Sequence, residues 1–246
     1  MEFIGEVIGW FADPASWSGN DGVPARLGEH LVLSVVPLLL ALVVGLPLGI
    51  LVGHTGRGAA AVVNLANIGR AVPSLAILII AFQLVLPPLV AAGLRREAAE
   101  VATGLAMLAL AVPPLVTNSY VGIADVDRDL IEAGRGMGMS GAQVLRAVEL
   151  PLAIPLILAG VRTAAVQVVA TATLGAVVGT GGFGRYIVDG IAQRRHEEVF
   201  AGALLVALLS IATELLFGAL QARAAPRGVR GGTRPEVDRV PEPAAI

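Results

Sequence analysis

Residues 31–53 read LVLSVVPLLLALVVGLPLGILVG, a run without a single charged side chain. About 20 apolar residues in an α-helix, rising 1.5 Å each, span the roughly 30 Å hydrocarbon layer of a bilayer. Membrane helices tolerate prolines such as Pro37 and Pro47, because neighbouring groups satisfy the carbonyls that proline leaves unpaired. The stretch therefore predicts a membrane-spanning helix.

Further apolar blocks follow the first one and extend the prediction to most of the chain. They cover residues 71–92, 98–118, 152–178 and 199–221. Hydrophobic residues make up 56% of the sequence and charged residues only 15%, with a mean hydropathy of +0.80. A water-soluble domain carries roughly 25% charged residues. We therefore expect an all-α membrane protein with about five transmembrane helices, forming one domain over residues 30–222.

The two ends of the chain differ from this domain. Apolar residues at positions 3, 4, 7, 8 and 11 form one helical stripe within residues 1–29, which predicts a short helix in the membrane interface. The acidic start argues against a cleaved signal peptide. Residues 223–246 are rich in arginine and proline and are expected to form a disordered tail.

The residue inventory excludes several kinds of chemistry. The sequence has no cysteine, so thiolate metal sites and thiol nucleophiles are excluded. It has no lysine either, and a P-loop ATPase needs a lysine on the β- and γ-phosphates. His30, His54 and His196 lie far apart in the sequence. We expect no catalytic residue, metal site, cofactor or nucleic acid partner, and the chain is not predicted to be an enzyme.

Arginine distribution predicts the orientation, because cytoplasmic loops of membrane proteins are enriched in basic residues. With five spans and the C-terminus inside, the inner segments hold the arginines at positions 57, 70, 128, 135, 146, 223, 227, 230, 234 and 239. The outer segments hold those at positions 26, 95, 96, 185, 194 and 195. The excess favours an outside N-terminus and a cytoplasmic C-terminus.

The longest polar interruption between spans covers residues 122–151, and its central part, 129–151, reads DLIEAGRGMGMSGAQVLRAVELP. Ser140 is placed to cap a second short helix, which Pro151 is expected to end. The glycines between the two helices permit a tight turn. Such an element suits a groove on a cytoplasmic partner, but its spacing alone equally fits a loop that merely joins two spans.

The same stretch resembles the cytoplasmic signature of the integral membrane subunits of bacterial binding-protein-dependent ABC importers. That signature is Glu-Ala-Ala, three residues, Gly, nine residues, Ile, any residue and Leu-Pro. This chain has Glu132-Ala133-Gly134, then Gly138, then Val148-Glu149-Leu150-Pro151 at the same spacing. The departures, Gly134 and Val148, are conservative in size. The resemblance implies that Glu132, Ala133, Gly134, Gly138, Leu150 and Pro151 couple the chain to an ATPase subunit.

The resemblance covers roughly residues 30–220 and is closest to the osmoprotectant branch, which imports glycine betaine, choline or carnitine. It implies a type I importer permease fold, similar to that of methionine permeases, in the bacterial cytoplasmic (inner) membrane. The implied partners are a dimer of ATP-binding subunits, a second permease copy or sister permease, an extracytoplasmic substrate-binding protein and membrane lipid. ATP is then bound by the partner, and this chain forms the translocation pathway.

Several polar residues lie inside the apolar blocks. Arg162 and Glu214 have similar predicted depths, so they either form an intramembrane ion pair or extend separately to the inner interface. Ser74, Thr171 and Thr173 are candidate pathway residues, although small polar residues in spans also serve helix packing. The glycine-rich run at residues 179–184 is expected to be a flexible outer loop facing the binding protein.

Two alternative functions remain open from the sequence. A permease for another small solute, such as methionine, shares several of the quoted motifs. An ion-coupled secondary transporter is the alternative from another class, and it usually shows inverted repeats and intramembrane carboxylates. We find no internal repeat, and Glu214 is the one acid deep within a predicted span.

Overall fold

The computed structural model describes residues 2–95 and 97–224, with the side chains of residues 65 and 70 left out. Every element in this part of the chain is helical. Among the described residues, five helices are long and apolar enough to cross a membrane: Val23–Thr55, Ser74–Ala91, Glu97–Ala124, Gly141–Val178 and His196–Ala224. The expected all-α membrane protein with about five spans is confirmed. The disordered tail predicted for residues 223–246 lies almost wholly outside the described residues.

The elements follow one another with short connections. In chain order they are α1 (Glu2–Ala12), η1 (Pro14–Trp17), α2 (Val23–Thr55), α3 (Ala59–Ala71), α4 (Ser74–Ala91), α5 (Glu97–Ala124), α6 (Arg128–Gly136), α7 (Gly141–Val144), η2 (Leu145–Glu149), α8 (Leu150–Thr171), η3 (Ala172–Val178), α9 (Gly184–Gln193) and α10 (His196–Ala224). The first span begins at Val23, so the boundary expected between residues 29 and 30 falls inside α2.

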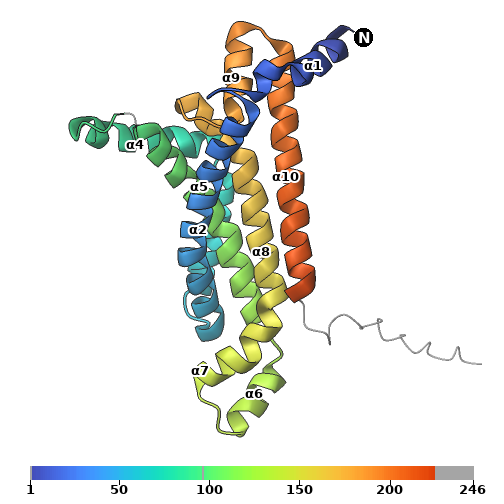
Figure 1. Cartoon of the computed structure of the whole chain (residues 1–246). Helices are drawn as coiled ribbons and strands as arrows, with labels where there is room; N and C mark the ends of the chain where they lie inside the picture. The colour runs from blue at the N-terminus through green and yellow to red at the C-terminus, as the bar shows by residue number, and fades with distance from the viewer. Residues whose placement is uncertain (1, 96, 225–246) are drawn as a thin grey trace, which may run out of the picture.

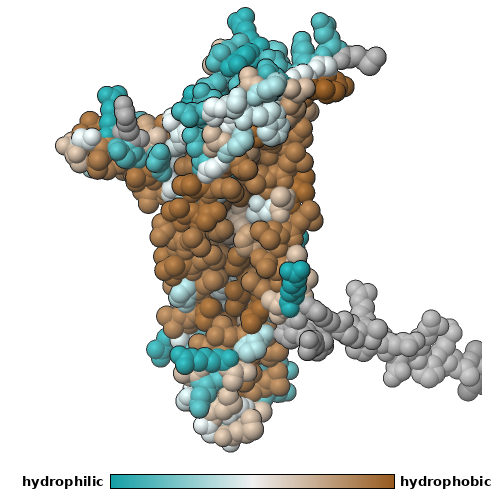
Figure 2. All heavy atoms as spheres, in the orientation of Figure 1, coloured by the Kyte–Doolittle hydropathy of each residue, from teal (hydrophilic) through white to brown (hydrophobic). Residues whose placement is uncertain are grey.

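The long helices α2, α5, α8 and α10 lie side by side, and the shorter elements gather at the two ends of this bundle (Figure 1). The α9 end carries α1 and α9, and the α6 end carries α6 and α7. Apolar side chains cover the middle of the visible face, and hydrophilic ones gather at both ends (Figure 2). This banding is what a protein surrounded by lipid requires.

Glycines bring α2 and α5 close together. A Cβ at Gly49 would lie 2.6 Å from the Val116 carbonyl oxygen, and one at Gly45 would lie 2.9 Å from the Leu115 Cβ. Small residues that let two backbones approach are typical of helix packing in membranes. The buried core then continues from these helices into α8 and touches α4 at Leu78.

The helix α4 projects away from the bundle (Figure 1). Leu78 is the one residue of its described length that is buried, whereas Ile80 and Leu84 are 57% and 72% exposed. A helix with so much apolar surface is suited to lipid or to another apolar protein surface.

Candidate functional site

The predicted coupling element is an exposed pair of short helices at the α6 end. The Asp127 carboxylate caps α6 by accepting a hydrogen bond from the Asp129 amide at 2.9 Å. The chain then turns through Gly138, whose φ of +86° suits glycine and strains other residues. Leu130 and Met137 are 47% and 79% exposed, so the element presents apolar side chains on its outer surface.

The second half of the element joins directly to a membrane helix. Ser140 and Gln143 form the capping box that starts α7, and the Ser140 amide donates to the Gln143 Oε1 at 2.7 Å. The expected end of this helix at Pro151 is wrong. The turn Leu145–Glu149 is π-helical, and the Leu150 amide donates to the Leu145 carbonyl five residues back. Pro151 therefore lies in the first turn of α8, where its missing N–H is tolerated.

The residues of the signature have different environments in this element. Glu132 and Ala133 are exposed on α6, and Gly138 is exposed at the turn. Gly134 is buried, and a Cβ there would lie 3.2 Å from the Met139 Sδ. Leu150 and Pro151 are half-buried at the start of α8. The glycine spacing thus allows α6 to pack closely on the segment that follows it.

A polar pocket of about 630 Å³ lies between α6 and the ends of α2 and α5. Its walls include Arg128, Glu132 and Arg135 from the α6 segment. On the opposite side are His54, from the last turn of α2, and Glu149, from the π-helical turn. Neither His54 nor Glu149 was singled out as functional from the sequence.

A second, smaller pocket brings together two of the predicted pathway residues. It measures about 300 Å³ and lies where α3 ends and α4 begins, with Ser74 on one side and Thr171 on the other. Gln167, one turn before Thr171 on α8, also lines it and was missed. Thr173 is not part of this lining; it is half-buried, and its hydroxyl donates to the Ala170 carbonyl at 2.9 Å.

Arg162 and Glu214 lie on the adjacent helices α8 and α10 and form an ion pair. The second guanidinium nitrogen of Arg162 donates to the Gln221 Oε1 at 3.4 Å. The Gln221 amide in turn donates to the Pro155 carbonyl at 3.0 Å. Of the two arrangements open from the sequence, the structure has the paired one, and it ties α10 to α8.

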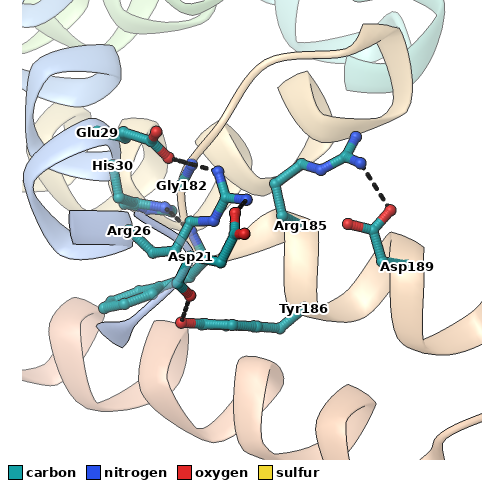
Figure 3. A network of polar contacts seen from close by, with 9 residues as sticks. Asp21, Arg26, Glu29, His30, Gly182, Arg185, Tyr186 and Asp189 are labelled. Carbon is teal, nitrogen blue, oxygen red and sulfur yellow. Dashed lines mark hydrogen bonds and ion pairs between the residues drawn. The ribbon is translucent and has the colours of Figure 1, made fainter. Parts of the chain in front are cut away.

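The glycine-rich run expected to be a flexible loop is held in place at the α9 end (Figure 3). The Gly182 amide donates to the Glu29 Oε2 at 2.7 Å, and the Phe183 amide donates to the His30 Nδ1 at 3.3 Å. The His30 Nε2 lies 2.9 Å from the Val169 carbonyl and donates to it. The run is therefore attached to both α2 and α8, through contacts between residues about 150 positions apart.

Charges and aromatic rings continue this network around the same end (Figure 3). Arg26 bridges Asp21 at 2.5 Å and Glu29 at 2.8 Å. The Tyr186 hydroxyl donates to the Asp21 carbonyl at 2.6 Å, and burial raises the pKa of this phenol to about 12. The Trp10 ring packs edge-on against Tyr186, with centroids 5.3 Å apart. The Tyr186 contacts join α9 to α1 and to the segment before α2, and Arg26 ties that segment to α2.

Comparison with known proteins relates the whole bundle to one family. Residues 45–227 match the family described as binding-protein-dependent transport system inner membrane component. The sequence is 36% identical over 206 residues to the glycine betaine/carnitine/choline transport system permease protein OpuCB of Bacillus subtilis, covering 84% of this chain and 90% of that one. It is 34% identical over 212 residues to the osmoprotectant import permease protein OsmW of Salmonella typhimurium, covering 86% and 96%.

Solved structures give the same fold. An inward-facing structure of the MetNI methionine ABC transporter aligns with a TM-score of 0.69 at 21% identity, covering 83% of this chain and 96% of that one. An amino acid ABC transporter structure aligns with a TM-score of 0.54, also at 21% identity. The predicted methionine-permease-like fold is confirmed.

Proposed function

The chain belongs to the family of binding-protein-dependent transport system inner membrane components, and from this premise we propose that it imports small quaternary ammonium osmoprotectants. The substrate class follows from relatives such as OpuCB and OsmW, which are named for glycine betaine, carnitine and choline transport or for osmoprotectant import. It is favoured over methionine because those relatives are 34–36% identical, whereas the methionine transporter is only 21% identical.

The coupling element is the observation that carries the mechanism. This exposed pair of short helices belongs to a multi-pass membrane protein and bears the signature residues from Glu132 to Pro151. Its second helix is continuous with α8. We infer that α6 docks on a cytoplasmic ATP-binding subunit through exposed residues including Leu130, Glu132 and Met137. ATP is then bound and hydrolysed by a dimer of that partner, and this chain needs no cofactor of its own.

The orientation follows from this docking. The α6 end faces the cytoplasm, where ATP is available, and the α9 end with the N-terminus faces outward. The arginine distribution supports the same assignment. An extracytoplasmic binding protein then delivers solute at the α9 end, and α4 with its exposed apolar residues is suited to contact a second permease subunit or lipid.

The pathway is proposed to pass the small pocket that holds Ser74, Gln167 and Thr171. A polar lining next to an apolar core is what a hydrated solute needs in order to pass through a membrane. ATP-driven movement of α6 then tilts α8 and opens this lining to one side at a time, as alternating access requires. Thr173 is left out of the lining because it does not reach the pocket.

Reconstitution tests the proposed function. The chain is purified with its ATP-binding subunit, placed in proteoliposomes with its binding protein, and assayed for uptake of glycine betaine, choline, carnitine and methionine. We expect ATP-dependent uptake of at least one quaternary ammonium compound and no uptake of methionine. Uptake of methionine alone would overturn the substrate class, and failure of any ATP-binding subunit to copurify would overturn the importer mechanism.

Thiol labelling tests the pathway in the same vesicles. Because the chain has no cysteine, Ser74→Cys and Thr171→Cys each introduce a single thiol. Both are expected to react with a charged, membrane-impermeant thiosulfonate reagent during turnover, and more slowly when the transported solute is present in excess. Thr163→Cys is the control, because Thr163 is an exposed residue of α8 about two turns before Thr171 and does not line the pocket. Equal labelling and no protection at all three sites would exclude this pathway.

A further inference from the structure

His54 and Glu149 form a side-chain pair at the α6 end. The His54 Nδ1 lies 2.5 Å from the Glu149 Oε2, and the Glu149 side chain is only 4% exposed. A buried carboxylate is costly unless it is paired or hydrogen-bonded. The pair joins the last turn of α2 to the π-helical turn, two segments 95 positions apart in the sequence.

His54 also faces the start of the coupling element's second helix. A Cβ on Gly141, the first residue of α7, would lie 3.6 Å from the His54 Nε2. The imidazole therefore lies against both ends of the segment from Gly141 to Glu149. The 630 Å³ pocket separates α6 from this end of α2. The His54 imidazole instead contacts the segment that follows α6, through Glu149.

The segment that holds Glu149 packs against α6. A Cβ at Gly134 would lie 3.7 Å from the Val144 Cγ2 and 3.9 Å from the Val148 Cγ2. Val144 is fully buried, and Val148 directly precedes Glu149. A displacement of α6 is therefore transmitted to the π-helical turn, because close-packed groups move together.

His54, the other member of the pair, belongs to α2, which packs on α5. A Cβ at Gly53 would lie 2.7 Å from the Ile123 Cβ, so α2 and α5 are in close contact up to the turn that holds His54. Single π-helical turns inside α-helices occur frequently at functional sites. Here the π-helical turn directs a carboxylate toward another helix.

We propose that His54 and Glu149 are positioning residues that transmit the movement of α6 to α2, so that ATP hydrolysis and opening of the pathway stay coupled. This inference rests on the proposed import function. The α8 helix carries the movement directly, and the His54–Glu149 pair makes α2 follow it. Without the pair, the transporter still hydrolyses ATP, but fewer cycles move a solute.

The test compares variants of the complete transporter in proteoliposomes by the number of ATP molecules hydrolysed per solute imported. His54→Ala removes the partner of Glu149, and His54→Gln keeps a side-chain N–H that can donate to it. Glu149→Gln keeps the size and one oxygen that can accept a hydrogen bond, but it replaces the other oxygen with an NH2 group and removes the charge. The control is the double variant His196→Gln/Glu197→Gln, which changes the same residue types at the opposite end of the molecule.

His54→Ala is expected to raise the ATP-to-solute ratio about 2- to 30-fold, the range by which residues along a coupled network change coupling. His54→Gln is expected to restore most of the wild-type ratio. The control is expected to leave the ratio unchanged. Copurification with the ATP-binding subunit is measured for each variant, because a merely structural role would lower the yield of the complex and not the ratio.

Suppose that the wild-type chain imports solute. The inference is then overturned if His54→Ala and Glu149→Gln have the same ATP-to-solute ratio as the wild type. It is also overturned if the effects of His54→Ala and Glu149→Gln simply add in the double variant, since a functional pair must show an interaction energy. A wild-type chain that imports nothing overturns the proposed function as well, so the two failures are told apart by the wild-type measurement.

Discussion

Replacing His30 by leucine is expected to detach the glycine-rich run from the membrane helices. His30 is fully buried and joins the Phe183 amide to the Val169 carbonyl. Leucine has a similar volume but offers no hydrogen-bonding atom, so both backbone groups lose this partner. Each buried group left unpaired costs about 1–3 kcal/mol.

The structure limits the size of this loss. The bond to the Phe183 amide is long, at 3.3 Å, so its contribution belongs at the low end of the range. The Val169 carbonyl has a second lone pair, which reduces its loss too. Leucine also gains from burial of its apolar surface. The expected net loss of stability is about 1–2 kcal/mol.

Thermal unfolding in lipid nanodiscs measures the loss. It is followed by the fluorescence of Trp10, which packs on Tyr186, and of Trp17, which bonds the end of α1. Hydrogen exchange at the Phe183 amide gives a local measure, and a loss of 2 kcal/mol corresponds to about 30-fold faster exchange. His196→Leu is the control, because His196 is exposed at the same end. If His30→Leu matches this control in both measurements, the imidazole does not hold the run.

Three further substitutions test other parts of the structure. Gly138→Ala places a side chain at φ +86° and costs about 1–2 kcal/mol at the turn between α6 and α7, so solute-stimulated ATPase activity should fall. Gly136→Ala has open space around it and should not change this activity. Gly49→Ala forces α2 away from the Val116 carbonyl and should lower the unfolding temperature. Gly28→Ala on the same helix should be neutral or stabilising. Equal effects of the two substitutions would contradict the close packing of α2 on α5. Because burial raises the pKa of Tyr186 to about 12 from 10.0, its neutral form stabilises the fold fully below pH 10, and this contribution is lost as pH rises toward 12. Tyr186→Phe should remove that loss from the stability profile, and an unchanged profile would show that another group titrates.

The spans were predictable from the sequence because an apolar block of about 20 residues crosses a bilayer as an α-helix, which satisfies its own backbone hydrogen bonds. The signature around Glu132 and Gly138 was equally visible, because its spacing is local. Gln167 could have been found as well, since it lies four residues before Thr171 and therefore on the same helix face. A polar amide inside an apolar block was the signal.

Other features depend on contacts that the sequence does not reveal. His30 and Glu29 meet the glycine-rich run only because α2 and the loop after η3 lie side by side in the fold. Glu149 occupies the variable position of the signature, and its burial against His54 depends on where α2 ends. Pro151 was misread because a proline after a short helix usually ends it, and the π-helical turn that accommodates it leaves no clear pattern in the sequence.

The unbroken helical path from Gly141 to Val178 has a mechanical consequence. Gly141 and Thr171 are separated by 30 residues, which at 1.5 Å each is about 45 Å. A rigid rod of that length, pivoting by about 5° at one tip, swings its other tip by about 4 Å. If α6 docks on an ATP-binding subunit as proposed, a modest angular stroke there is amplified to roughly the width of a methyl group at Thr171, without any rearrangement of the core in between.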